Sequence, residues 1–198
     1  MKIRKVQEKD VKKGLIIGVS GISCSGKTLL ASKLTKKLKI DNTLHVDDYW
    51  KDYKLIPKSV SKWREWERPS NIAFDNLLKD LLRLKEKGRT ILVEGVYLYY
   101  KKAIRDIIDF KIYIRIPSGM VLKRRINKFG IGDKQKFYTR EILLKEYAKY
   151  GKKTAKYADL VLRGDKDATK NVLRIVKELI LRDVNYPLAN KSRKMRRG

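Results

Sequence analysis

A glycine-rich segment that ends in lysine and threonine carries the strongest chemical signal in the chain. Residues 21–28 read GISCSGKT and match the pattern G-x-x-x-x-G-K-[ST]. The glycines let the backbone approach phosphate groups closely, and amides at the start of a helix donate hydrogen bonds to anions. An apolar run at 15–19 precedes the segment and a helical pattern at 27–38 follows it. This context favours a phosphate-binding loop over a chance match in a turn.

The residue types in this loop predict how it would hold ATP. Lys27 is expected to bridge the β- and γ-phosphates and to act in catalysis, and Thr28 is expected to ligate Mg²⁺. Cys24 is interpreted as a small loop residue, because nothing supports a redox role. The positions expected to bind the nucleotide are Gly21, Ser23, Cys24, Ser25, Gly26, Lys27, Thr28 and Leu29.

Two carboxylates are expected at the ends of neighbouring strands. Asp47 comes just after a short strand predicted at 43–46, and Glu94 just after one predicted at 90–93. Ligands of open parallel sheets bind outside the carboxyl ends of the strands. Phosphoryl transfer needs a carboxylate near the acceptor hydroxyl and an acidic group near the metal. Asp47 suits the first role and Glu94 the second, and a helix cap or turn residue is the alternative for either. His45 is expected to pack or to hydrogen-bond within its strand.

Strands and helices that alternate along the chain must position these residues. Short apolar strands alternate with helical patterns, which predicts an α/β fold with a parallel sheet of about five strands and helices on both faces. Residues 49–71 show no clean period and are interpreted as an ordered, aromatic-rich loop. Further strands are predicted at 110–116 and 160–162, and further helices at 72–87, at 120–128 with Ser118 as cap, from the cap Thr139 to about 156, and at 165–182.

The segment at about 127–140 is predicted to form a small basic lid. Glycines at 130 and 132 are surrounded by lysine and arginine, and a mobile basic segment can exclude water from a reacting phosphoryl group. Arg125 is the preferred phosphate clamp and Arg124 the next. A basic surface loop is the alternative interpretation.

The amino-acid composition excludes several classes of protein. The chain has 198 residues, of which 42% are hydrophobic, so a packed core is expected. One Cys and one His exclude an internal disulfide and a Cys/His zinc site. No apolar run reaches the ~20 residues of a membrane span, and the first residues lack the apolar core of a signal peptide, so a cytoplasmic location is expected.

The charge has two interpretations. The formal net charge is +28, from 50 Lys plus Arg against 22 Asp plus Glu. Such a charge attracts polyanions, which keeps a nucleic-acid partner open, whereas a lysine-rich proteome would produce it without function. We divide the chain into a basic N-terminal arm at 1–13, one domain at 14–182 and a basic C-terminal tail at 183–198.

Five segments together resemble the uridine kinase and nicotinamide riboside kinase family, which is also related to phosphoribulokinase. They are GISCSGKT, HVDDYW at 45–50, WERP at 66–69 with AFD at 73–75, VEGVYLYY at 93–100 and KYADLVL at 156–162. The resemblance runs from about Gly14 to Leu181. It implies a three-layer P-loop NTPase fold, with Asp47 as the base for a sugar 5′-hydroxyl and Glu94 in the metal shell.

The resemblance also implies how an acceptor is held. Glu67 takes the place of an acidic residue, usually Asp in uridine kinases, that holds ribose hydroxyls. The lid departs from the family's Arg-Gly-Arg and reads FGIGDK at 129–134. The residues expected to contact the acceptor are Asp47, Tyr49, Trp50, Glu67, Arg68 and Tyr97.

These observations predict an ATP- and Mg²⁺-dependent phosphotransferase acting on a hydroxyl of a small acceptor, of the uridine, cytidine or nicotinamide riboside type. Two alternatives stay open: a kinase of RNA or DNA ends, and a nucleic-acid-binding protein on the same fold. No membrane partner is expected, and the sequence does not determine the oligomeric state.

Overall fold

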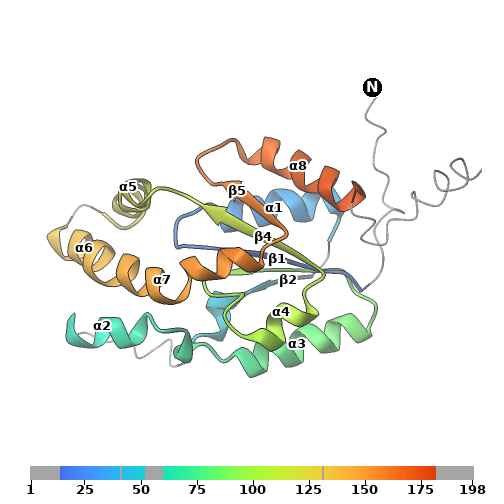
Figure 1. Ribbon diagram of the computed structural model, residues 1–198, viewed down its shortest axis with the longest axis horizontal. Helices are drawn as coiled ribbons and strands as arrows, with labels where there is room; N and C mark the ends of the chain where they lie inside the picture. Colours follow the sequence, from blue (N-terminus) through green and yellow to red (C-terminus); the bar gives the residue numbers. More distant parts are fainter. Residues whose placement is uncertain (1–13, 41, 52–59, 131, 182–198) are drawn as a thin grey trace, which may run out of the picture.

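Five parallel strands form the centre of the molecule (Figure 1). The computed structural model describes residues 14–40, 42–51, 60–130 and 132–181. The sheet order is β2-β3-β1-β4-β5. This arrangement confirms the predicted three-layer α/β fold. The strands are β1 Ile16–Gly21, β2 Asn42–His45, β3 Ile91–Gly95, β4 Phe110–Arg115 and β5 Leu160–Arg163.

The place of each strand in the sheet explains its sequence. β1 and β3 are central and buried at every position, which is why they read as continuous apolar runs. β5 lies at an edge and alternates buried and exposed residues. In the register of the sheet His45 on β2 lies opposite Glu94 on β3, so both side chains belong to the same end of the sheet.

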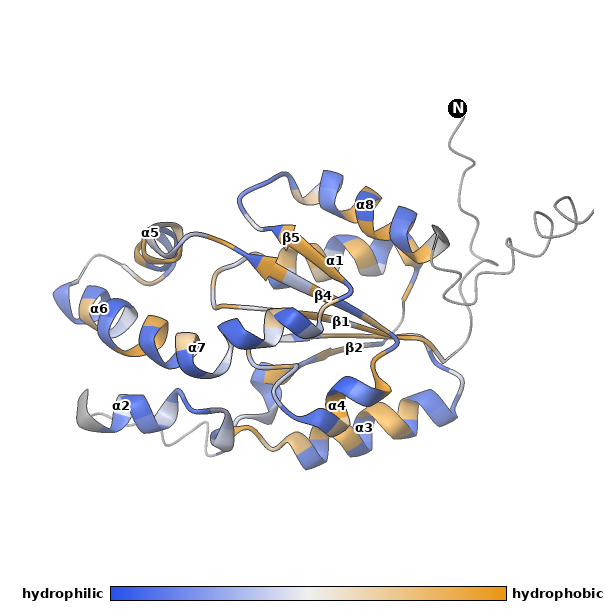
Figure 2. Cartoon of the chain, viewed as in Figure 1, coloured by the Kyte–Doolittle hydropathy of each residue, from blue (hydrophilic) through white to orange (hydrophobic). Residues whose placement is uncertain are grey.

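Helices cover both faces of the sheet (Figure 1). α1 (Lys27–Leu38) and α8 (Ala168–Leu181) pack together on one face. α3 (Phe74–Glu86) and α4 (Lys102–Ile107) cover the other. Figure 2 shows the apolar strands enclosed between helices whose polar sides face outward. The two apolar layers, with Leu34 and Ile175 in one and Leu77 and Ile104 in the other, are buried and hold the sheet in place.

The remaining elements are helices that follow β2 or β4 along the chain. They bring the lid and the acceptor side to the phosphate loop. These elements are the 3-10 helices η2 Val46–Tyr49, η4 Pro69–Asn71 and η6 Lys152–Tyr157, the α-helices α2 Val60–Trp66, α5 Ser118–Phe129, α6 Asp133–Phe137 and α7 Leu144–Tyr150, and the π-helix η5 Tyr138–Leu143.

Both predicted helix caps are wrong. Thr139 lies inside a helical segment, where it is fully buried and its hydroxyl donates to the carbonyl of Gln135 at 2.8 Å. A threonine can bond back to the preceding turn in this way as readily as it caps a helix. Ser118 is the first residue of α5, and Pro117 precedes it in extended conformation without a side-chain cap.

Some of the helical elements were not predicted. Part of the segment 49–71 forms α2 and η4 instead of a loop, and α4 is a short helix that its sequence pattern does not reveal. The helix predicted from Thr139 to about 156 is divided into η5, α7 and η6. The N-terminal arm at 1–13 and the tail at 183–198 lie outside the described residues. Among the residues that are described, no helix combines the length and the apolarity needed to cross a membrane.

Candidate active site

The glycine-rich loop joins β1 to α1 and has the shape of a phosphate cradle. Gly26 has a φ of 97°, and the non-glycine Cys24 also takes a left-handed conformation with φ 61°. A Cβ on Gly21 would lie 2.7 Å from the Ile114 carbonyl oxygen and 2.9 Å from Ser25 Oγ. Only glycine therefore lets the loop turn this closely over the end of β4.

Two polar groups in the loop point to an anion. The Ser25 hydroxyl is buried without a hydrogen-bond partner among the described residues. Lys27 is 8% exposed, and its ammonium donates to the carbonyl of Ile22 at 3.1 Å. Burial lowers the Lys27 pKa, while the carboxylates of Glu94 and Asp47 raise it. A buried cation and an unpaired hydroxyl at a helix start suit the phosphates of a nucleotide.

A threonine, a carboxylate and a histidine meet at the carboxyl end of β3. Thr28 Oγ1 donates to Glu94 Oε1 at 3.0 Å, and His45 Nδ1 lies 2.9 Å from the same oxygen. No group of three or more His, Cys, Asp or Glu side chains in the described parts of the chain forms a metal site. Mg²⁺ in kinases usually takes one or two protein ligands and the substrate's phosphates. The Thr28–Glu94 pair fits such a site.

Asp47 follows β2, on the turn of η2. Its side chain is exposed, yet partial removal of water by the surrounding protein raises its pKa; Lys27 lowers it and Glu94 raises it. Asp47 and Glu94 both act on Lys27, so the structure brings the two predicted carboxylates and the loop lysine together. A carboxylate with a raised pKa beside a phosphate loop can accept a proton from a hydroxyl.

Glu67 lies across from these groups, just after α2, and is 8% exposed. Burial raises its pKa to about 7, Arg125 lowers it, and Asp47 and Glu146 raise it. The Tyr138 hydroxyl donates a short hydrogen bond to Glu67 Oε1. Glu67 is therefore held close to both the predicted base and the predicted clamp.

Two arginines on α5 contact the phosphate loop. Arg124 donates to the carbonyl of Cys24 at 3.1 Å and to that of Gly164 at 2.8 Å. Arg125 donates from Nη1 to Ser23 Oγ at 2.9 Å, which places its guanidinium over the loop. Arg124 thus ties the loop to the end of β5, and Arg125 is the better placed of the two for a phosphoryl group.

Two predicted acceptor contacts differ in exposure. Tyr97 is fully buried with φ 60°, and its hydroxyl has no hydrogen-bond partner within the described part of the chain. Its pKa is raised by burial and by Glu67 and Glu146. Tyr97 is therefore buried close to Glu67. Arg68 is exposed beside it.

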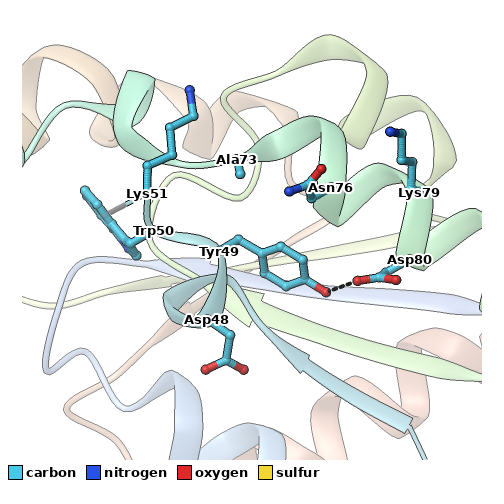
Figure 3. A pocket seen from close by; sticks show the side chains of 8 residues that line it. All are labelled: Asp48, Tyr49, Trp50, Lys51, Ala73, Asn76, Lys79 and Asp80. Atoms are coloured by element: carbon cyan, nitrogen blue, oxygen red, sulfur yellow. Dashed lines mark hydrogen bonds between the residues drawn. The ribbon is translucent and has the colours of Figure 1, made fainter. Parts of the chain in front are cut away.

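Tyr49 and Trp50 line an open pocket of about 700 Å³ beside α3 (Figure 3). The Tyr49 hydroxyl donates to Asp80 Oδ2 at 2.8 Å, which turns this ring toward α3. Trp50 stacks on Trp66 with ring centroids 5.5 Å apart. Trp63 is buried and meets the Tyr138 ring edge-on. Trp63 and Trp66 therefore pack against other aromatic side chains.

Three residues of the site were not predicted from the sequence. A Cβ on Gly164 would lie 2.2 Å from the Ser25 carbonyl oxygen, so a glycine after β5 lets the loop pack there. Gln135 accepts hydrogen bonds from Arg125 Nε and Nη2, at 3.1 and 3.0 Å, with its amide oxygen turned toward the guanidinium. Tyr138 joins Glu67 to the lid. The position of Gly164 after a predicted strand could have indicated it from the sequence, whereas no sequence signal indicates Gln135 or Tyr138.

Curated relatives of this chain are uridine kinases. A uridine kinase of Leuconostoc citreum is 27% identical over 144 residues, covering 59% of this chain and 69% of the relative. A uridine kinase of Borrelia duttonii is 25% identical and covers 85% of this chain and 96% of the relative. No protein-family model matches the chain.

Solved structures with the same fold are small-molecule kinases. A Bacillus stearothermophilus protein described as a possible uridine kinase has a TM-score of 0.54 at 22% identity, covering 75% of this chain and 88% of that one. Shikimate kinase from Acinetobacter baumannii, in complex with shikimate, also has a TM-score of 0.54, at 17% identity, covering 85% and 94%. At these identities the likeness establishes the fold.

Proposed function

We propose that this chain, an ATP-dependent P-loop kinase similar in sequence to the uridine kinases, transfers the γ-phosphoryl group of ATP to a hydroxyl of a nucleoside-like acceptor. The meeting of Lys27, Asp47 and Glu94 at the carboxyl ends of neighbouring strands carries the proposal. Lys27, at one end of this group, suits phosphates, and Asp47, at the other end, suits a hydroxyl. The names of the curated relatives support a nucleoside as the acceptor class.

The residues divide the work as phosphoryl transfer requires. Loop amides and Lys27 hold the phosphates, and Arg125 neutralises charge that develops on the transferring group. Asp47 accepts the proton of the attacking hydroxyl as its oxygen bonds to phosphorus and the bond to the β-phosphate oxygen breaks. Thr28 and Glu94 would hold Mg²⁺, which when bound neutralises phosphate charge.

Glu67 supplies the acceptor side. Its carboxylate accepts hydrogen bonds from hydroxyl groups, and a ribose offers two neighbouring ones. Because the Asp47 carboxylate is close enough to raise the Glu67 pKa, an acceptor held by Glu67 would lie within reach of Asp47. The lid then excludes water, which would otherwise compete as acceptor.

An acceptor panel tests this proposal. Purified protein is incubated with ATP, Mg²⁺ and, separately, uridine, cytidine, nicotinamide riboside, shikimate, gluconate and a short RNA with a 5′-hydroxyl. We expect a monophosphate from at least one nucleoside, identified by mass. The variant Lys27→Met is the control and is expected to form none. Product from shikimate or gluconate alone would contradict the nucleoside proposal, and product from none of them would contradict the kinase reaction with a small hydroxyl acceptor.

A further inference from the structure

A continuous set of contacts joins the acceptor side to the phosphate loop through one tyrosine. Tyr138, the first residue of η5, donates its hydroxyl hydrogen to Glu67 Oε1. The Tyr138 ring lies 5.3 Å from the Arg125 guanidinium, within cation–π range. Arg125 donates in turn to Ser23 Oγ at 2.9 Å. Tyr138 therefore contacts the acceptor-side carboxylate with its hydroxyl and the phosphate-side cation with its ring.

The surroundings hold Tyr138 in this orientation. The Trp63 ring packs edge-on against it, with centroids 5.3 Å apart and an interplanar angle of 85°. The next residue, Thr139, is fully buried and bonds back to the carbonyl of Gln135. Gln135 lies one turn earlier and accepts from the same guanidinium. π-helices cost stability and occur often at functional sites, so a π-helix that starts at the contacting residue supports a role for it.

We infer that Tyr138 is a positioning residue that couples the state of Glu67 to the placement of Arg125 over the phosphates. The inference rests on the proposed function for the roles of Glu67 and Arg125. When Glu67 is ionised, it holds the Tyr138 hydroxyl, and the ring stays beneath the guanidinium. When the carboxyl is neutral, the hold weakens and Arg125 loses one of its supports.

The charge of Glu67 changes in the neutral range, which gives the coupling a pH signature. Burial raises the Glu67 pKa to about 7. The groups that face it are Arg125 from α5, Asp47 from η2, Glu146 from α7, Tyr138 from η5 and Tyr97 from the segment after β3. A hydrogen bond from Tyr138 stabilises the ionised form. The coupling is therefore present above pH 7 and is lost as the pH falls through that value.

A double-mutant cycle on nucleotide affinity tests the coupling without any acceptor. The Kd of adenylyl imidodiphosphate with Mg²⁺ is measured at pH 8 for the wild type, Tyr138→Phe, Glu67→Gln and the double variant. We expect each single change to weaken binding about fivefold, in the range of one lost ordinary hydrogen bond. We expect the double variant to be no weaker than either single one, because both break the same link.

The pH dependence separates the coupling from a purely structural effect. The wild-type affinity divided by that of Tyr138→Phe is expected to fall from about five at pH 8 toward one at pH 6. This ratio cancels the titration of the nucleotide itself. Tyr157→Phe is the matched control, because its ring lies 4.1 Å from the Arg105 guanidinium, away from this site. The control is expected to bind as the wild type at every pH.

Two results would overturn the inference: single effects that multiply in the double variant, or a ratio that does not change with pH. Either would leave Glu67 acting on Arg125 directly by charge. Failure of the proposed function would give a different pattern of results. A protein that binds the analogue with the predicted cycle but phosphorylates no nucleoside keeps the coupling and loses the acceptor. Cooperative thermal unfolding of each variant, with a midpoint not more than a few degrees below that of the wild type, shows that the variant is folded.

Discussion

Glu67 is a carboxyl group kept where its charge is unfavourable. It is nearly buried and close to Asp47 and Glu146, and within the described part of the chain its ionised form is favoured by Arg125 and the Tyr138 hydroxyl. Side chains placed at such a cost often serve binding or catalysis. Above pH 7 this residue is expected to lower the stability of the fold in exchange for a site that can accept hydrogen bonds.

Glu67→Gln is therefore expected to stabilise the protein at pH 8. The pKa of Glu67 is about 7 in the fold against 4.5 as its ordinary value, so the folded state binds the proton more tightly. Wild-type stability then falls as the pH rises from about 4.5 to 7, and the variant lacks this fall. At pH 8 the free energy of unfolding of Glu67→Gln is expected to exceed that of the wild type by an amount of the order of 2–3 kcal/mol. Urea unfolding at several pH values measures this difference.

Glu65→Gln is the control, because Glu65 is exposed on α2, two residues before Glu67. Its unfolding midpoint is expected to match that of the wild type at each pH. Equal pH dependence of stability in the wild type and Glu67→Gln would show that Glu67 is ionised in the fold at an ordinary pKa.

At the level of elements, the turn after β2 depends on a close approach to β3. A Cβ on Gly95 would lie 2.2 Å from Val46 Cβ and 2.5 Å from Val46 Cγ2. Val46 is fully buried and directly precedes Asp47. A glycine at the end of β3 therefore sets how closely η2 carries the predicted base to the phosphate loop.

Gly95→Ala is expected to push η2 outward and to destabilise the fold by about 1–3 kcal/mol. The kcat is expected to fall by a larger factor than the factor by which the KM for ATP changes. Denaturant unfolding and steady-state kinetics measure the two effects. Gly119→Ala on α5 is the matched control, because nothing lies within 4 Å of a Cβ there. We expect it to leave both quantities near wild-type values. A stable and fully active Gly95→Ala would show that the position of η2 does not set the rate.

The sequence predicts the parts of the site that follow directly from local pattern. Lys27, Thr28, Asp47 and Glu94 each lie in or next to a loop that follows a strand, and the ends of parallel strands meet. Tyr138 could not be found in this way, because it meets a carboxylate 71 residues earlier in the chain. The predicted Thr139 cap fails for a related reason, since a buried threonine in a continuous helix and one at its start have the same sequence signal.

On the scale of the whole molecule, the charge is spread through the chain. The segments 1–13 and 183–198 carry eleven basic and three acidic residues, so most of the net +28 belongs to the domain between them. In the proposed reaction, Lys27 and Arg125 are the cations that contact the phosphates. The remaining positive charge is expected to attract polyanions without selecting their sequence.

We predict weak, salt-sensitive binding to a short RNA, with no phosphorylation of its 5′ end. Affinity is expected to fall linearly on a log–log plot against salt, with a slope of roughly 0.7 per phosphate contacted. Removal of 183–198 takes away five basic residues and is expected to flatten this slope while kcat for a nucleoside stays the same. End-labelling of RNA faster than of uridine would instead favour a kinase of nucleic-acid ends.

The central claim is that Asp47 accepts the proton of a nucleoside hydroxyl during transfer from ATP. The most direct measurement compares phosphoryl transfer from γ-labelled ATP to uridine by the wild type, Asp47→Asn and the neighbouring Asp48→Asn. We predict that Asp47→Asn lowers kcat about 10²- to 10⁴-fold while the Kd of the ATP analogue changes less than twofold. Asp48→Asn is predicted to keep most activity. Full transfer by Asp47→Asn, or no transfer to any nucleoside by the wild type, would contradict the account.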